Sequence, residues 1–336
     1  MRHQMKTCGF AAAAAFAAVI AFAPIRGNAA TTYAFGTGYS GDHVHLSDPL
    51  NYYGKVVPPS DIHESWLRVF LNGKYAENDL PSDHLLRGIQ FTDGAGSGHI
   101  DGNPFNIGIA GITTEAVKPT SPSIATQVFN TAINIATNLS SQIPITPAAR
   151  NCLRFNGPIG VYGDPNDCTN KLLAFNGAGE TIIAGGMTIP TETGYETRQQ
   201  FSAGTVRMIS DVSVPSFSFE GSVHVILDNG ATLKNTSKWT ERATLNSFFN
   251  GKSVFDIIDG KFLPESAICT AQAKESDTAI NLYGTSVIDT GNKGLRLANN
   301  GKVTINIYDS ARFFKRNSLN LLQASITSSN VIPWRT

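Results

Sequence analysis

Five histidines lie close together in the sequence and could form a metal site. An H-x-H pair on a β-strand points both imidazoles to one face, where they can bind one zinc ion. A third ligand, either His63, His84 or a nearby carboxylate, would complete the site and leave a position open for water. The sequence therefore predicts zinc as a candidate cofactor, with the candidate ligands His43, His45, His63 and His84; His99 follows them in the chain.

The alternative is that these histidines are exposed loop residues paired with neighbouring acids. His63 lies near Asp61 and Glu64, and His84 follows Asp83. The spacing does not match the H-E-x-x-H motif of zinc hydrolases. We therefore assign no catalytic residue to this histidine cluster.

Other catalytic signatures are weak. The sequence contains no G-x-S-x-G motif for a nucleophilic serine, and the glycine-rich stretch 91–112 contains no G-x-G-x-x-G motif for binding phosphate. Paired carboxylates of a glycosidase or lyase can come from distant positions. The aspartates available for this are Asp256, Asp259, Asp289 and Asp309, which are more typical of turns.

Aromatic residues near the start of the mature chain form a candidate binding site. Tyrosine and tryptophan offer a large contact area at low entropic cost, which suits sugar or protein recognition. The alternative is that some of them are core residues. The candidates are Tyr39, Tyr52, Tyr53 and Trp66.

Residues 1–29 have the layout of a secretory signal peptide. Arg2 and Lys6 form a basic start, an Ala-rich apolar stretch follows, and small residues precede cleavage after Ala29 or Ala30. We expect an exported protein, located outside the cell, on its surface or in the periplasm. No later stretch has the ~20 apolar residues of a membrane-spanning helix.

Composition describes a globular chain with little charge. Hydrophobic residues make up 41% of the 336 residues and charged residues 15%, below the usual value of about 25%. The chain has 26 basic and 26 acidic residues, and cleavage removes three basic ones (Arg2, Lys6 and Arg26), so the mature chain carries −3. A nucleic-acid partner, which needs a basic surface, is therefore not expected.

Three cysteines remain after cleavage: Cys152, Cys168 and Cys269. Because export favours disulfides, we predict a bridge between Cys152 and Cys168, which would stabilise the fold by roughly 3 kcal/mol. Cys269 is interpreted as a buried, small apolar residue.

The last third of the chain reads as short alternating strands separated by tight turns. Val303, Ile305 and Ile307 alternate with polar residues, as in a strand with one buried face. The turns contain pairs that tolerate positive φ: Asn229-Gly230, Asn250-Gly251, Asp259-Gly260 and Asn300-Gly301. One helix is predicted over 122–140, with Ser121 as cap, Pro122 in the first turn, and Val128, Ile135 and Leu139 on one face.

The fold is predicted to be mainly β, and two architectures compete for its C-terminal part. If Val225, Phe255, Leu282 and Ile305 are equivalent positions of successive coils, they favour a parallel β-solenoid. The alternative is an antiparallel β-sandwich or jelly roll. We divide the chain into a signal peptide (1–29), a strand- and loop-rich region with the helix and the 152–168 loop (30–200), and a solenoid-like region (201–336).

Two segments of this region, 225–236 and 301–308, resemble coils of bacterial surface-exposed β-helix proteins, the autotransporter passengers and haemagglutinin-type adhesins. The resemblance implies an adhesin-like binding module without catalysis, associated with the outer membrane, whose partner is a glycan, a matrix component or a host or cell-surface protein. The alternatives are an exported carbohydrate-active or metal-dependent hydrolase or lyase, and a pilus-type subunit that self-assembles.

Overall fold

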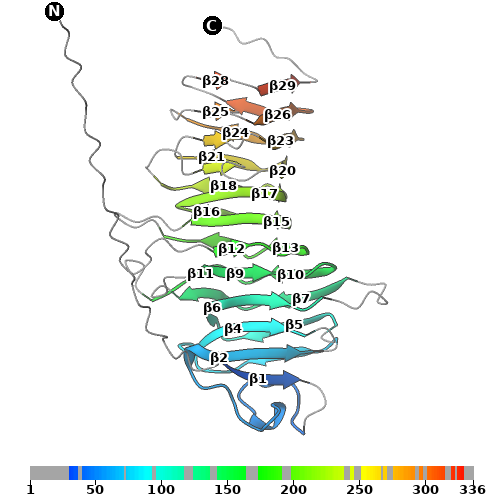
Figure 1. Cartoon of the computed structure of the whole chain (residues 1–336), viewed down its shortest axis with the longest axis vertical. Coiled ribbons are helices and arrows are strands. Elements are labelled where there is room, and N and C mark those ends of the chain that lie inside the picture. Colours follow the sequence, from blue (N-terminus) through cyan, green and yellow to red (C-terminus); the bar gives the residue numbers. More distant parts are fainter. Residues whose placement is uncertain are drawn as a thin grey trace, which may run out of the picture.

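The computed structural model is a single stack of short parallel strands (Figure 1). It describes residues 30–36, 40–71, 73–92, 96–116, 124–136, 142–163, 173–190, 198–237, 243–245, 251–265, 268–270, 275–291, 295–297, 301–314, 319–321 and 324–328. The predicted signal peptide lies outside these residues.

The strands form three columns, and the chain visits them in the order 1, 2, 3 in each coil. Column 1 contains β1 (Thr31–Gly36), β2 (Asp61–Phe70), β4 (Leu85–Phe91), β6 (Phe105–Thr114), β9 (Ile143–Thr146), β12 (Leu173–Phe175), β15 (Arg198–Met208), β17 (Ser216–Leu227), β19 (Ala243–Leu245), β22 (Ile268–Thr270), β25 (Leu295–Leu297) and β28 (Leu319–Leu321).

Columns 2 and 3 are built in the same way, and the long strands β2, β4, β6, β15 and β17 bend from one column into the next. Column 2 adds β3 (Tyr75–Asn78), β5 (Gly98–Gly102), β7 (Ala125–Phe129), β10 (Asn151–Phe155), β13 (Glu180–Ile183), β20 (Gly251–Ile258), β23 (Ser276–Tyr283), β26 (Lys302–Ile307) and β29 (Ala324–Ser328). Column 3 adds β8 (Ile133–Ala136), β11 (Ile159–Tyr162), β14 (Met187–Thr188), β16 (Val212–Val214), β18 (Thr232–Asn235), β21 (Lys261–Pro264), β24 (Val287–Asp289) and β27 (Arg312–Phe314).

This register confirms the parallel β-solenoid and excludes the antiparallel sandwich, because all the named strand pairs are parallel. The predicted equivalence was wrong at one position. Phe255 pairs with Ile280, not Leu282, so the coil spacing from Val225 through Phe255 and Ile280 to Ile305 is 30, 25 and 25 residues. The solenoid also begins earlier than predicted, at β1, and β15 runs across the predicted boundary at residue 200.

The predicted helix over 122–140 is wrong. The described part of this span forms β7 and β8, and Phe129, Ile133 and Ile135 point into the core. A turn at residues 130–132 separates the two strands and shifts their alternation, so the apolar residues recur at intervals that imitate a helical face. Among the described residues the only helix is the 3-10 turn η1 (Pro49–Asn51), and none has the length and apolarity needed to cross a membrane.

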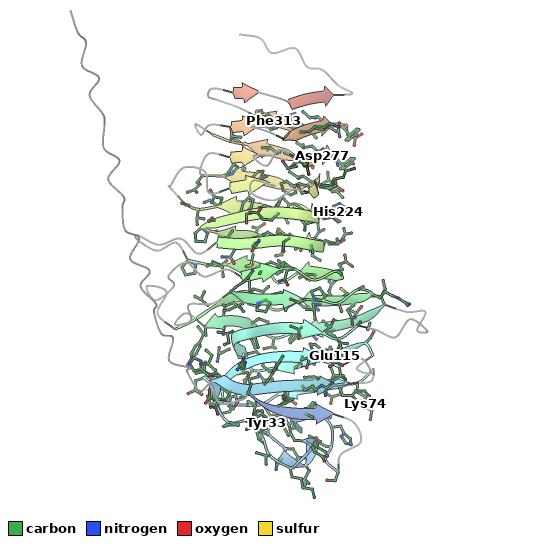
Figure 2. All side chains as sticks on the ribbon, viewed as in Figure 1. Tyr33, Lys74, Glu115, His224, Asp277 and Phe313 are labelled. Carbon is green, nitrogen blue, oxygen red and sulfur yellow. The ribbon has the colours of Figure 1, made fainter. Side chains whose placement is uncertain are left out.

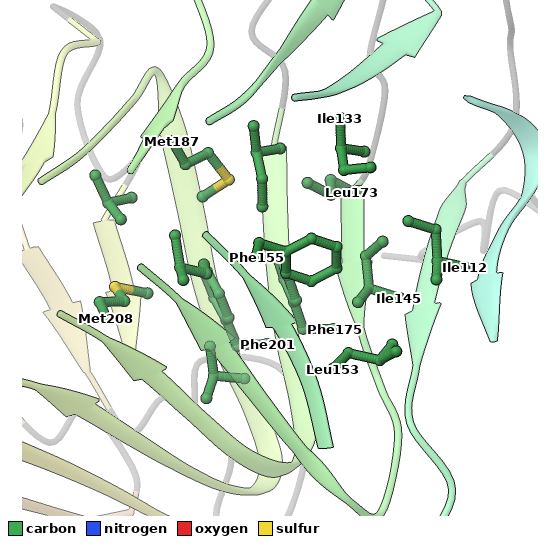
Figure 3. Packing of buried hydrophobic residues seen from close by; sticks show 14 of the residues in the cluster. Ile112, Ile133, Ile145, Leu153, Phe155, Leu173, Phe175, Met187, Phe201 and Met208 are labelled. Carbon is green, nitrogen blue, oxygen red and sulfur yellow. The ribbon is translucent and has the colours of Figure 1, made fainter. Parts of the chain in front are cut away.

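The core is one continuous cluster of apolar side chains enclosed by the three columns. Figure 3 shows its middle part, where equivalent side chains of successive coils stack on one another. The rings of Phe175 and Phe201, which pair in column 1, lie 4.8 Å apart and nearly parallel. Phe129 and Phe155 do the same in column 2 at 5.3 Å.

Left-handed residues recur at the corner between columns 2 and 3. Asn229, Asp259, Gly284 and Asp309 each follow the last inward residue of their strand by two positions and have φ of 58°, 54°, 63° and 52°. The prediction of positive φ at Asn229-Gly230 and Asp259 is confirmed, whereas Asn250 and Asn300 lie outside the described residues. Asp259 also accepts hydrogen bonds from the backbone and side chain of Thr285, which joins adjacent coils and lowers the pKa of Asp259.

Candidate functional site

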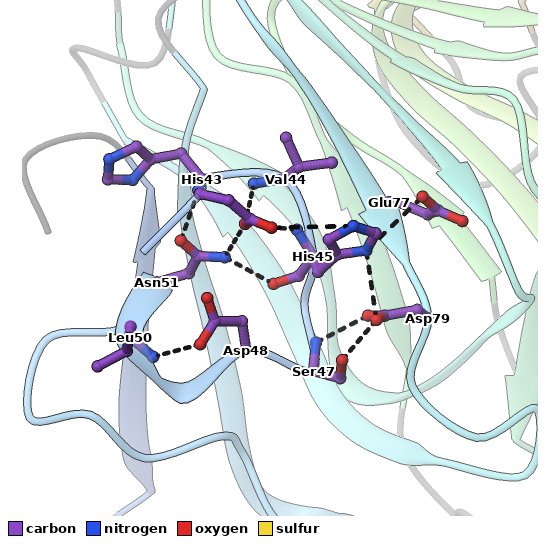
Figure 4. Close-up of polar contacts among 10 residues, drawn as sticks. His43, Val44, His45, Ser47, Asp48, Leu50, Asn51, Glu77 and Asp79 are labelled. Carbon is purple, nitrogen blue, oxygen red and sulfur yellow. Dashed lines mark hydrogen bonds and ion pairs between the residues drawn. The ribbon is translucent and has the colours of Figure 1, made fainter. Parts of the chain in front are cut away.

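Residues 40–57 form a cap over the N-terminal end of the solenoid (Figure 4). Val44 and Leu46 exchange backbone hydrogen bonds with Glu77, which adds a rung to column 2. At column 1, Phe35 forms an antiparallel bridge to Tyr52, and their rings meet edge to face at 5.4 Å. The predicted histidine and aromatic sites both fall in or near this cap.

His43 and His45 do not lie on a regular strand, because His43 has a left-handed backbone with φ of 62°. The Nδ1 atom of His43 contacts the carbonyl of Gly36 at 2.9 Å. The ring of His45 is surrounded by acids, with Asp79 at 3.4 Å, Glu77 at 3.7 Å and Asp42 at 3.8 Å. The geometry on which the H-x-H interpretation depends is therefore not seen.

The other two candidate ligands lie outside this cap. His63 is exposed on β2, and His84 is half-buried between β3 and β4. Burial lowers the pKa of His84, which favours its neutral form, while Asp83 acts in the opposite direction. Within the described ranges, no group of three or more His, Cys, Asp or Glu side chains is arranged to hold a metal ion.

Hydrogen bonds explain why the cap contains Asp42 and Asn51. The Asp42 carboxylate accepts from the backbone N–H of Val44 and of His45 and from the amide of Asn51. These bonds lower the pKa of Asp42 to about 2, with the Asn51 bond contributing most. Asn51 is completely buried and also donates to the His45 carbonyl, so this polar network fixes the loop.

The aromatic candidates have different surroundings. Tyr52 is a core residue of the cap: it is 1% exposed, and its hydroxyl donates to the Leu46 carbonyl. Tyr53 is 79% exposed. Trp66 is half-buried on the outer side of column 1, and Tyr39 lies outside the described residues.

Of the predicted disulfide pair, the structure describes only Cys152. This residue is buried on β10, and burial raises the pKa of its thiol to about 11. Cys168 lies outside the described residues, so the bridge stays a prediction.

The outer side of column 2 is a regular surface along the stack, which we call the column-2 face. Its central row runs along the stack through successive paired strands: Tyr75, His99, Val128, Arg154, Ile182, Arg207, Ile226, Asp256, Asn281 and Asn306. His224 and Asp277 of this face are labelled along one side of the stack in Figure 2. Adjacent strands lie about 4.8 Å apart, so the row repeats at that interval.

Polar side chains of this face bind one another from coil to coil. Arg207 pairs with Asp228 at 3.0 Å and with Glu180 at 3.5 Å. Nearer the N-terminus, Asn130 donates to Asp101, and Asn156 donates to Asn130. These contacts link consecutive rungs and hold the side chains in fixed positions.

The C-terminal part of the face contains a ladder made by His224, Asp256, Asn281 and Asn306, which we call the polar ladder. His224 Nε2 lies 2.8 Å from one oxygen of Asp256, and the amide of Asn281 donates to the other at 2.7 Å. The amide of Asn306 then donates to the Asn281 carbonyl at 2.7 Å. The Asp256 charge is thus satisfied on both sides.

An aromatic pair lies beside this ladder. Tyr283 and Tyr308 follow Asn281 and Asn306 by two residues, so they share their side of the sheet. Their rings stack at 4.9 Å with an angle of 3° between planes, and Tyr308 is 37% exposed. Partial burial, helped by Asp256, raises the pKa of Tyr283, so its phenol remains protonated and can donate a hydrogen bond.

The sequence did not identify this arrangement as a site. Of the tail carboxylates, Asp259 and Asp309 lie at turns as predicted, and Asp289 accepts from the N–H of Gly291, two residues later. Asp256 instead lies on β20, where its carboxylate contacts both His224 and Asn281. The usable signal was the 25-residue spacing of Asp256, Asn281 and Asn306, which correct alignment of the coils reveals.

The arrangement can bind a partner through fixed hydrogen-bond donors and acceptors on a long, flat surface. It presents no assembled metal centre within the described residues. No protein-family model matches the chain, and neither a curated protein nor a solved structure matches it.

Proposed function

We propose that the chain is an exported binding protein of the adhesin type, which contacts a glycan, a matrix component or a cell-surface protein through the column-2 face. The observation that supports this is the outer side of column 2, on which polar side chains are held by contacts between coils. Side chains that are already ordered lose little entropy on binding, which favours affinity. Export itself is supported by the layout of residues 1–29.

Binding is tested with the mature chain on arrays of glycans, matrix proteins and cell-surface proteins. Ala279, an outward residue of column 2, is replaced by Lys to obstruct the face. The matched control places the same side chain on column 3 through Ser213→Lys. We expect Ala279→Lys alone to weaken binding at least tenfold. A chain that binds nothing on these arrays, and whose deletion leaves surface attachment unchanged, would refute the proposal.

Export is tested by N-terminal sequencing of the protein recovered outside the cytoplasm. The expected new N-terminus is Ala30 or Thr31. Recovery of an intact chain that still begins at Met1 or Met5 would contradict cleavage.

The second candidate function is an exported carbohydrate-active hydrolase or lyase, favoured by the His224–Asp256 contact at 2.8 Å. A carboxylate that holds one ring nitrogen orients a histidine for general base catalysis at the other. Polysaccharide degradation by the purified chain, lost in His224→Gln and kept in the exposed control His63→Gln, would support this candidate over the non-enzymatic one.

A further inference from the structure

We infer that the polar ladder and the Tyr283–Tyr308 pair bind an uncharged, hydroxyl-rich glycan. This inference deepens the proposed function and rests on it, because it assigns a ligand class to one part of the column-2 face. It is carried by three properties of the described side chains: their unused hydrogen-bonding groups, their charge balance and their fixed spacing.

The amides of the ladder retain hydrogen-bonding capacity. The side-chain amides of Asn281 and Asn306 each have two N–H groups. In each amide, one N–H donates to another described residue and the other has no such acceptor. The carbonyl oxygen of Asn306 and the hydroxyls of both tyrosines also have no hydrogen-bond partner among these residues. The site therefore offers donors and acceptors together, as a ligand with many hydroxyl groups requires.

Charge balance favours an uncharged ligand. His224 and Asp256 are the titratable members of the ladder, and they contact each other. The Asp256 side chain is only 18% exposed, and its two oxygens already accept hydrogen bonds. Lys252, Asp277 and Lys302 lie four residues earlier on three consecutive strands, in a separate row of alternating sign. Lys252 and Lys302 therefore balance Asp256 and Asp277, so the ladder and this row together add no net charge that would select an ionic ligand.

Spacing makes these groups act together. The three rungs from Asp256 to Asn306 span about 10 Å, and the tyrosines lie about 7 Å along the strands from the amides. Stacking holds the two tyrosine rings, so the aromatic surface and the amides are placed before the ligand arrives. A protein partner would require a larger apolar centre than this polar zone provides.

The test measures binding of neutral and acidic oligosaccharides to the full mature chain. Tyr283→Phe combined with Tyr308→Phe removes both hydroxyls and keeps the rings. The matched control is Tyr33→Phe combined with Tyr162→Phe, which removes two hydroxyls from β1 of column 1 and β11 of column 3, outside the column-2 face. We expect the variant with both Tyr283→Phe and Tyr308→Phe to bind a neutral glycan about tenfold more weakly than the wild type. The affinity of the control variant should stay within about twofold of the wild type.

The inference would be overturned if the Tyr283→Phe, Tyr308→Phe variant bound the neutral glycan with the same affinity as the wild type. Binding confined to acidic glycans and abolished by about 0.5 M salt would also overturn it, as would binding confined to proteins. In each of these cases the proposed function stands if Ala279→Lys still weakens binding. If the wild type binds nothing on the array, both the glycan inference and the proposed binding function are refuted. Unchanged circular dichroism of the variants confirms that they fold.

Discussion

At the scale of single residues, the corner glycines show how much one side chain can disturb a coil. Gly230 and Gly284 are both left-handed, with φ of 74° and 63°. A Cβ atom on Gly230 would meet nothing within 4 Å, whereas one on Gly284 would clash with an Asp259 carboxylate oxygen. The two positions therefore separate backbone strain from steric conflict.

We predict that Gly230→Ala lowers the free energy of unfolding by about 1–2 kcal/mol, the cost of a left-handed alanine. Gly284→Ala should cost about 2–4 kcal/mol, because Asp259 must also move and release Thr285. Urea unfolding of both variants measures the difference. If both variants lose the same free energy of unfolding, the Asp259 side chain moves aside without an energetic cost.

His84 predicts a pH dependence. Burial lowers its pKa below the ordinary value of 6.5. Between the lowered value and 6.5 the unfolded chain binds more protons than the folded chain, so stability rises with pH in that window. The contribution of neutral His84 is complete above pH 6.5 and is lost as the pH falls towards its folded pKa.

We therefore expect His84→Gln to flatten the dependence of unfolding free energy on pH between 5 and 7, the region of histidine titration. The exposed His63→Gln variant serves as the control and should retain the wild-type slope. Identical slopes for His84→Gln and the wild type would contradict the assignment.

At the scale of strands, the core depends on stacking between coils. Phe201 is completely buried and lies against Phe175 at 4.8 Å and Phe219 at 5.5 Å. We expect Phe201→Ala to cost about 3–5 kcal/mol in the free energy of unfolding, because the cavity would interrupt two ring contacts. Val254→Ala, on the outer side of β20, should cost below about 1 kcal/mol. Comparable losses in thermal or urea unfolding would argue against a core that depends on stacking.

The strands could be predicted where inward and outward residues alternate without interruption. Val303, Ile305 and Ile307 alternate with polar residues, and β26 forms there. The span 122–140 failed because two short strands and a turn reproduce the spacing of a helix. The choice of Leu282 over Ile280 failed because both point inward on β23, and only pairing with the next strand distinguishes them.

The column-2 face, which we propose as the binding surface, was less predictable than the strands. Successive members of the row along column 2 lie 19 to 30 positions apart in the chain, so no local motif contains the row. The spacing of His43 and His45 predicted a shared metal site. In the cap, however, the ring of His45 lies among Asp42, Glu77 and Asp79. Asp256, Asn281 and Asn306 are recognised as neighbours only when the pairing of β20, β23 and β26 is known.

At the scale of the whole molecule, repetition predicts tolerance to removal of a complete coil. Asp277 pairs with Lys302, so deletion of residues 277–301 would join equivalent positions and preserve the inward row. We expect this variant to fold with an unchanged β-type circular dichroism spectrum, since each coil contacts only its neighbours. A disordered spectrum would contradict this modular description.

An insertion provides the opposite test. One alanine placed between Ile280 and Asn281 would turn Leu282 outward and break the register with β20 and β26. We expect loss of cooperative unfolding in this variant. A melting temperature equal to that of the wild type would mean that register does not determine stability here.

The N-terminal cap has a consequence for how copies of the chain behave towards one another. A bare first rung would expose a row of N–H and C=O groups, onto which the strand of another molecule could add. Val44 and Leu46 occupy the N–H and C=O of Glu77 in a parallel bridge at column 2, and Tyr53 donates to the Ala34 carbonyl beside the antiparallel bridge at column 1. A surface of mixed direction offers no template for a further identical layer. We therefore expect the cap to oppose the growth of fibres from this end of the solenoid.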